Sequence, residues 1–218
     1  MKSNFSKADW LIPSGLIMLS LIPVIAGSVR LFSLASGAAV TPQNARFFAQ
    51  PLPVVVHIIG VTLFCLLGAL QFSPGLRRRN LRWHRMSGRI VLPAGMISAL
   101  SGLWMAMSYD IVPQDKALLH AMRLTFGSAM FVSMCLGLAA ILRRDIARHR
   151  VWMMRGYAIG IGAGTQAFTH LPWIVAFGFP SPMPYAILMG AGWVINLAVV
   201  EWVICSAAGL QTPVRTLA

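Results

Sequence analysis

Residues 117–142 read ALLHAMRLTFGSAMFVSMCLGLAAIL, an apolar run in which Arg123 is the only charged residue. The run is longer than the roughly 20 residues that a helix needs to cross the hydrocarbon core of a bilayer. Five further runs of this kind occur, at about 10–30, 52–72, 88–109, 152–177 and 184–206. The sequence therefore predicts an all-α, polytopic membrane bundle in which residues 1–218 form a single domain of six transmembrane helices.

The composition agrees with this prediction and narrows the function. Hydrophobic residues make up 57% of the chain and charged residues 11%, whereas about a quarter of the residues of a soluble domain are charged. The net charge of +13 would suggest nucleic acid as partner of a soluble protein, but the basic residues form short clusters between long apolar runs, which excludes that partner. Hydrolase and transferase motifs are absent from the sequence, and a membrane oxidoreductase remains an open possibility.

The basic residues also predict the orientation. When successive loops are assigned to alternate sides, fourteen of the eighteen Lys and Arg residues fall on one side, which is expected to be the cytoplasm. We therefore expect a bacterial inner-membrane protein with both termini cytoplasmic. The first apolar run is long for a signal sequence, so we interpret it as an uncleaved helix. The connection 34–51 is expected to form a short helix in the membrane interface.

Two basic loops share one motif, R-R-[ND]-[LI]-x-x-H-R, which reads RRNLRWHR at 78–85 and RRDIARHR at 143–150. Each copy joins a helix that enters the cytoplasmic side to the helix that returns. The second to fifth helices are therefore predicted to form two parallel helical-hairpin repeats. The simpler interpretation is that basic loops recur because topology requires them, and that their arginines contact anionic lipid headgroups.

Four histidines lie near the ends of the second to fifth helices. His57 and His120 are near the outer ends of the second and fourth, and His84 and His149 are at the inner ends of the third and fifth. Glycines follow at helical spacings on the same faces, among them Gly88, Gly95, Gly102, Gly156 and Gly160. Such faces either pack helices closely or leave room for a flat macrocycle whose iron takes one imidazole from each of two helices.

Other polar residues within the spans have their own predicted roles. His170, together with His57 and His120, would give three outer imidazoles, an alternative zinc or copper site. Glu201 is expected to pair with Arg155 on the neighbouring span. The remaining mid-membrane polar residues are expected to form hydrogen bonds between helices; they are Thr165, Gln166 and Asn196.

Several stretches resemble the bacterial membrane-protein family of unknown function numbered 2306, over most of the chain from about residue 30 to 205. The stretches are Pro53-Val-Val-Val-His57, LRRRNLRWHRMSGR at 76–89, Ser101-Gly-Leu-Trp104, His149-Arg-Val-Trp-Met-Met-Arg155 and Gly162-Ala-Gly-Thr-Gln166. The two H-R motifs with their basic loops are the most specific of them. This resemblance implies a multi-helix inner-membrane protein and no particular reaction.

In architecture alone the chain also resembles the two-haem b-type membrane cytochromes of the ascorbate-reducible kind, which have six helices and one histidine on each of helices 2 to 5. That resemblance implies an outer haem b on His57 and His120, and an inner one on His84 and His149. The haem propionates would then bind arginines, namely Arg123, Arg85 and Arg155. Electron transfer would require a membrane redox partner or a homo-oligomer. The alternative is a non-redox module: a small-solute or metal transporter, or an accessory subunit of a membrane complex.

Overall fold

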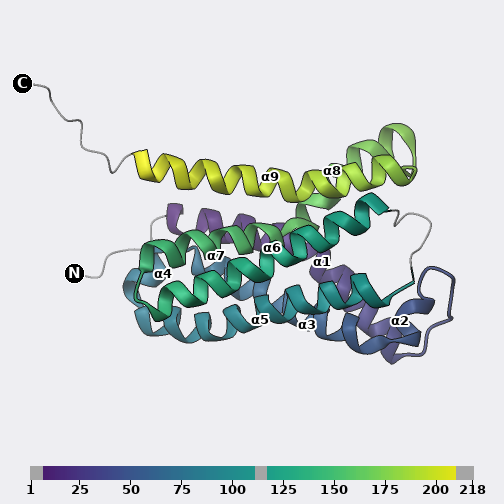
Figure 1. Ribbon diagram of the computed structural model, residues 1–218, viewed down its shortest axis with the longest axis horizontal. Helices are drawn as coiled ribbons and strands as arrows, with labels where there is room; N and C mark the ends of the chain where they lie inside the picture. Colours follow the sequence, from purple (N-terminus) through teal and green to yellow (C-terminus); the bar gives the residue numbers. More distant parts are fainter. Residues whose placement is uncertain (1–6, 111–116, 210–218) are drawn as a thin grey trace, which may run out of the picture.

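In the computed structural model of the chain, the described residues are 7–110 and 117–209. Within these two ranges the chain is helical and contains no strand (Figure 1). The helices are α1 Lys7–Ala35, α2 Ala45–Ala49, α3 Pro51–Gln71, α4 Pro74–Arg79, α5 Leu81–Ser108, α6 Ala117–Leu142, α7 Ile146–Gly160, α8 Gly162–Phe177 and α9 Pro182–Gly209. The predicted all-α class is confirmed.

Five of the described helices, α1, α3, α5, α6 and α9, are long and apolar enough to cross a membrane. They correspond to the predicted runs at 10–30, 52–72, 88–109, 117–142 and 184–206. Pro51 occupies the first turn of α3 and Pro74 the first turn of α4, where proline removes no helical hydrogen bond. The main difference in bounds is at α5, which begins at Leu81 and so includes part of the predicted basic loop.

The prediction of one continuous helix over 152–177 needs correction. The helix is interrupted at Ile161, which ends α7 and begins α8. Glycine has a low helix propensity, and Gly160 and Gly162 flank the interruption. Both glycines also meet large side chains, Phe64 opposite Gly160 and Trp193 opposite Gly162. Apolar character continues through both halves, so hydropathy alone does not reveal the break.

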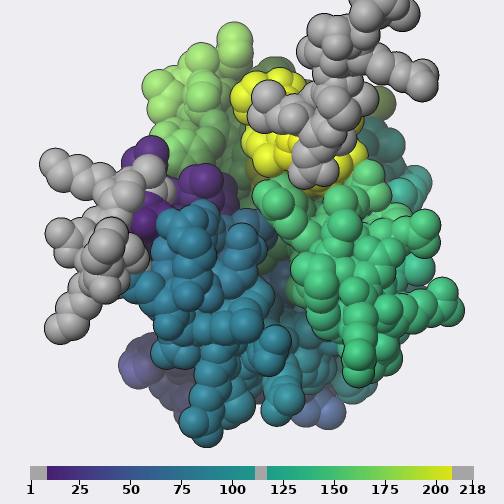
Figure 2. Space-filling model, turned by 90° about the vertical axis from the view of Figure 1, so that its left-hand side faces the viewer, coloured from purple at the N-terminus to yellow at the C-terminus, as the bar shows by residue number. Residues whose placement is uncertain are grey.

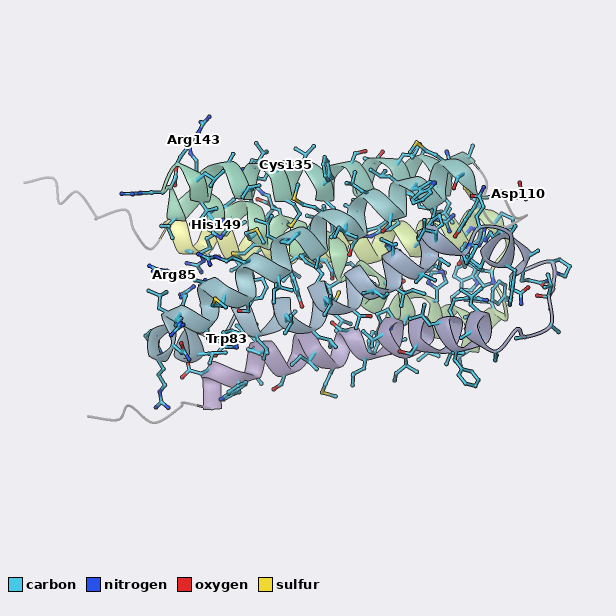
Figure 3. The ribbon with its side chains drawn as sticks, turned by 90° about the horizontal axis from the view of Figure 1, so that it is seen from below. Trp83, Arg85, Asp110, Cys135, Arg143 and His149 are labelled. Carbon is cyan, nitrogen blue, oxygen red and sulfur yellow. The ribbon has the colours of Figure 1, made fainter. Side chains whose placement is uncertain are left out.

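The long helices lie side by side along one axis (Figure 1). The main neighbours are α3 with α5, α6 with α7, and α5 with α6, while α1 covers α3 and α8 packs on α9. One end of the bundle contains α4, the starts of α1, α5 and α7, and the end of α9. We call this end the basic end. Figure 3 shows Arg85, Arg143 and His149 there and Asp110 at the opposite end, near α2.

The core lies between α3, α5, α6 and α7. Phe64 and Met134 are fully buried within it. The Tyr157 hydroxyl donates a hydrogen bond to the Cys65 carbonyl oxygen at 2.8 Å, and its ring packs on Phe64 at 5.4 Å. By contrast, large apolar side chains on the outward faces of α1, α8 and α9 are exposed. So extensive an exposed apolar surface is expected to face lipid.

Both copies of the basic motif begin a helix in the same way. The Asn80 side chain caps α5 by accepting a hydrogen bond from the Trp83 backbone N–H at 2.9 Å. The Asp145 side chain caps α7 by accepting one from the Arg148 N–H at 3.0 Å. Asparagine and aspartate are favoured at this position because they satisfy N–H groups that have no partner within the helix. In each copy the motif histidine therefore lies in the first turns of a helix.

Candidate functional site

A cavity of about 410 Å³ lies inside the bundle and reaches from α2 to the interruption between α7 and α8. Residues from α1, α2, α3, α5, α6, α7, α8 and α9 line it. Its size lies in the range of small-molecule sites. We call it the polar cavity, after the polar side chains on its wall, which include Arg46, His57, Tyr109, His120, Arg123 and Gln166.

His57 is held in one orientation on the wall formed by α3. Its Nδ1 atom lies 3.0 Å from the Ser98 carbonyl oxygen and 3.2 Å from the Ser101 hydroxyl. Because a carbonyl oxygen can only accept, Nδ1 carries the proton and the lone pair of the neutral ring lies on Nε2. Gly102 lies beside the ring, where a Cβ would be 3.4 Å from Cε1, an ordinary van der Waals contact. This arrangement is typical of a histidine that is oriented to bind a ligand through Nε2.

His120 and Arg123 line the cavity from α6. They are three residues apart, and such a spacing places two side chains on one face of a helix. Phe126 continues this face and stacks on Trp193 of α9, with ring centroids 4.7 Å apart. The structure thus brings together three of the residues predicted from the sequence, His57, His120 and Arg123, and adds an aromatic wall to them.

The short helix predicted in the connection 34–51 is present as α2, and its Arg46 and Phe47 line one end of the polar cavity. Its place in the membrane interface stays a prediction. The Arg46 guanidinium donates to the Asp110 carbonyl oxygen at 3.4 Å. Phe47 packs edge-on against Tyr109, at 5.5 Å between centroids, with the Arg30 guanidinium 4.5 Å from its ring. The Tyr109 phenol is protonated near neutral pH at its ordinary pKa, and desolvation raises that pKa further. The Tyr109 hydroxyl donates a hydrogen bond to the Gln50 carbonyl oxygen, just before α3.

Sequence reasoning did not identify Arg46, Tyr109, Gln166 and Trp193 as site residues, although all four line the cavity. Two signals were available: Arg46 is one of the four basic residues on the predicted outer side, and Gln166 is a polar residue within a span. With two arginines against one carboxylate, that of Asp110, on its wall, the cavity carries an excess of positive charge. Such a lining favours an anionic ligand.

His84 and His149 both lie at the basic end, in the first turns of α5 and α7. The Nδ1 atom of His149 lies 2.8 Å from the Gly137 carbonyl oxygen and donates to it. The Nδ1 atom of His84 is buried, and the described residues offer it no hydrogen-bond partner. The two motif histidines thus differ: the His149 ring is anchored by a backbone carbonyl oxygen, and the Nδ1 atom of His84 has no such partner among the described residues.

Neighbouring side chains fill most of the glycine faces. A Cβ on Gly95 would lie 2.6 Å from the Phe64 ring, and one on Gly156 would overlap the Met134 side chain. Gly88 has open space around it, with no atom within 4 Å of such a Cβ. At Gly95 and Gly156 the small residues therefore serve close helix packing, and the space there is not available to a macrocycle.

The predicted pairing of Arg155 with Glu201 is confirmed. The Arg155 Nε and Nη2 atoms donate to the two carboxylate oxygens at 2.6 and 2.9 Å, a bidentate arrangement. The predicted hydrogen bonds between the last two spans are also present: Thr165 donates to Asn196 at 2.8 Å, and Gln166 donates to a carbonyl of α9 at 3.0 Å. These contacts attach α9 to α7 and α8.

His170 lies elsewhere. Its Nδ1 atom donates to the Gln166 carbonyl oxygen at 2.7 Å, and its ring packs against Tyr185 at 5.0 Å. Over residues 7–110 and 117–209, no three His, Cys, Asp or Glu side chains are grouped so that they could hold a metal ion. The structure therefore does not bring His170 together with His57 and His120.

The fold and the cavity define an integral membrane protein of several apolar helices. Residues 54–204 match the family described as "Predicted membrane protein (DUF2306)", so the chain belongs to this family and the resemblance noted in its sequence is confirmed. No curated protein and no solved structure matches the chain. The resemblance to the two-haem cytochromes therefore stays a prediction.

Proposed function

We propose that this chain is an inner-membrane electron-transfer protein that binds a b-type haem in the polar cavity through His57 and His120. One observation carries the proposal: histidines from two different helices line the same cavity, and one of them is oriented by a backbone carbonyl. Bundles commonly build cofactor sites from side chains that face each other in this way.

The proposal includes six spans, with α7 and α8 together forming the fifth. The interruption at Ile161 lies against the polar cavity, and irregular backbone at membrane depth is tolerated where it lines a cavity or is buried in protein. The chain enters α1 and leaves α9 at the same end of the bundle (Figure 1), as an even number of crossings requires. The shared caps of α5 and α7 support the two-hairpin repeat, and the positive-inside rule would place the basic end in the cytoplasm.

The residues present fit the chemistry of a haem site. His57 would bind the iron through Nε2 and His120 through an imidazole nitrogen, while Arg46 and Arg123 would bind the propionates. The haem would supply one-electron chemistry. The chain itself contributes three things. The Ser98 carbonyl orients His57, the stacked Phe126 and Trp193 side chains exclude water from one wall, and α2 covers the outer end.

The test is a reduced-minus-oxidised spectrum of the full-length protein, expressed with a haem supply and purified in detergent. We expect a Soret band that shifts on addition of dithionite. His57→Ala and His120→Ala should each lower the haem content about tenfold or more, whereas His170→Ala should keep it. Size-exclusion profiles would verify that all three variants fold. A wild-type protein without a Soret band would refute haem binding, and a His120→Ala variant with full haem content would refute the pairing.

A second candidate is a non-redox transporter of small anionic solutes. A specific observation favours it, because discontinuous helices that line a central cavity are typical of transporter binding sites, and Gly160 and Ala163 line this one on either side of the interruption. Uptake of small carboxylates into proteoliposomes, lost in Arg123→Gln, would support it. Metal analysis separates the candidates further, since retained zinc or copper without haem favours the non-redox function.

A further inference from the structure

Two serines of α5 contact the same ring nitrogen of His57 on α3. The Nδ1 atom of His57 lies 3.0 Å from the Ser98 carbonyl oxygen and 3.2 Å from the Ser101 hydroxyl oxygen. Ser98 and Ser101 are only 2% and 3% exposed, so solvent does not compete for these contacts. Because α3 and α5 pack closely along their length, the contacts join two fixed elements.

The Ser101 hydroxyl acts as an acceptor toward His57. It donates its single hydrogen to its own helix, where the Ile97 carbonyl oxygen lies at 2.6 Å and the Ser98 carbonyl oxygen at 3.1 Å. The lone pairs of the hydroxyl remain for the histidine. The Nδ1 proton is thus shared between two acceptors on α5. A tautomer with its proton on Nε2 would lose both hydrogen bonds.

We propose that Ser101 is a positioning residue for the ligand site. Its hydroxyl, together with the Ser98 carbonyl oxygen, keeps the proton of the His57 ring on Nδ1 and leaves the lone pair of Nε2 to bind a ligand in the polar cavity. The proposal rests on the proposed function in one respect, because it takes this ligand to be the haem iron. The orientation of the ring requires no haem, so the two can be tested separately.

A matched serine elsewhere in the bundle shows what is particular to Ser101. A serine hydroxyl that donates to the preceding turn of its own helix is common and implies no function. Ser133 of α6 is an example: it is 5% exposed and donates to the Ala129 carbonyl oxygen at 2.7 Å. In the part of the chain that the structure describes, no histidine is among its hydrogen-bond partners. Ser101 differs because a ring nitrogen from a second helix lies on the acceptor side of its hydroxyl.

Acceptors on Nδ1 affect the iron as well as the ring. A histidine that donates its other N–H to an acceptor is fixed in orientation and becomes a more strongly donating ligand. Hydrogen bonding around an axial ligand is also one of the means by which a protein sets the reduction potential of haem. Stronger donation favours ferric iron, so the Ser101 hydroxyl should lower the potential and its removal should raise it.

The first experiment measures the ring itself in the full-length protein, purified without haem in detergent micelles. NMR of isotope-labelled histidine gives the rate at which the His57 Nδ1 proton exchanges with solvent, and His57→Ala assigns the signal. Ser101→Ala removes one of the two acceptors and leaves the Ser98 carbonyl. Loss of this hydrogen bond should make the exchange about two- to tenfold faster.

Two comparisons control this measurement. Ser133→Ala removes an equally buried hydroxyl and should leave the exchange rate of His57 as in wild type. His149 serves as an internal reference, because its Nδ1 atom donates to the Gly137 carbonyl oxygen at 2.8 Å. It lies at the basic end, which faces the viewer in Figure 2, and its exchange rate should be the same in Ser101→Ala and in wild type.

The second experiment is a redox titration of the haem-loaded protein. Ser101→Ala should raise the midpoint potential by up to about 59 mV, which corresponds to a tenfold change in the equilibrium constant of a one-electron couple. It should also weaken haem affinity about tenfold, as is typical when a partner of a ligating histidine is removed. Ser133→Ala should change neither quantity.

Faster exchange confined to His57 in Ser101→Ala supports the proposal. If the wild-type protein binds no haem, this result still supports it, and only the proposed function fails. The proposal is overturned if His57 exchanges equally fast in Ser101→Ala and in wild type, if haem-loaded Ser101→Ala has the wild-type potential, or if Ser133→Ala produces the same changes. Elution volume and unfolding temperature would show that both variants are folded, since each loses only a hydroxyl group.

Discussion

Replacing Gly95 with alanine should destabilise the bundle, whereas the same change at Gly88, seven residues earlier on α5, should not. A Cβ on Gly95 would lie 2.6 and 2.8 Å from two atoms of the Phe64 ring and 3.0 Å from the Met134 sulfur. Phe64 and Met134 both have 0% exposure, so neither can move aside into open space. A Cβ on Gly88 would have nothing within 4 Å.

The magnitude follows from two opposing effects. Overpacking of a core lowers the free energy of unfolding by about 1–3 kcal/mol. Replacing glycine by alanine within a helix raises it by about 1 kcal/mol. Gly95→Ala should therefore lower the free energy of unfolding by about 1 kcal/mol, the net of these two ranges. In Gly88→Ala only the helix propensity changes, so the free energy of unfolding should rise by up to about 1 kcal/mol. The two variants should differ by about 2 kcal/mol.

Equilibrium unfolding in mixed micelles, with increasing fractions of a denaturing detergent, would measure both variants against wild type. Phe64→Leu should partly restore Gly95→Ala, because a smaller side chain makes room for the new methyl group. This coupling should be about 0.5–3 kcal/mol, as for residues in direct contact. If Gly95→Ala proves at least as stable as Gly88→Ala, the conclusion that Phe64 fills this glycine face is wrong, and space for a ligand on that face would have to be reconsidered.

Three further predictions concern stability. Asn80→Ala and Asp145→Ala should each lower the free energy of unfolding by about 1 kcal/mol through loss of a helix cap, and a difference of more than about twofold between their effects would argue against equivalent motif copies. Glu201→Gln should cost no more than about 1 kcal/mol, because the two side chains of the Arg155 pair are 29% and 42% exposed; a double-mutant cycle with Arg155→Gln measures the coupling. Asn196→Leu should cost about 0.6 kcal/mol, a typical value for hydrogen bonds between membrane helices, and thermal unfolding that is unchanged or raised would contradict this.

Much of the fold can be predicted from the sequence. Apolar length identifies each span separately, so five spans agree with the structure, as does the short helix in the connection 34–51. The break at Ile161 was missed because hydropathy is an average over many residues, whereas the break depends on contacts of two flanking glycines with Phe64 and Trp193. The pairing of Arg155 with Glu201 could be predicted, since few other charges lie at that depth.

The candidate site was harder to predict. The sequence identifies His57, His120 and Arg123 as unusual residues within spans, and the structure shows that they share one cavity. The sequence cannot show that Arg46 reaches the same cavity from a short connecting helix, because that depends on how α2 folds back over α3 and α5. Likewise, the spacing of glycines does not distinguish a packed face from an open one. Phe64 and Met134, which fill two of these faces, come from other helices.

By itself, the sequence determined that this protein is a helical membrane protein and that its positive charge is concentrated at one end. Both properties follow from the transfer of individual residues between water and lipid, which needs no knowledge of contacts. Only the tertiary structure decided which histidines meet, which glycines are filled and where an unpartnered nitrogen is buried. Those properties depend on close packing between side chains from helices that are distant in the sequence, and residue spacing along one helix carries no information about its neighbours.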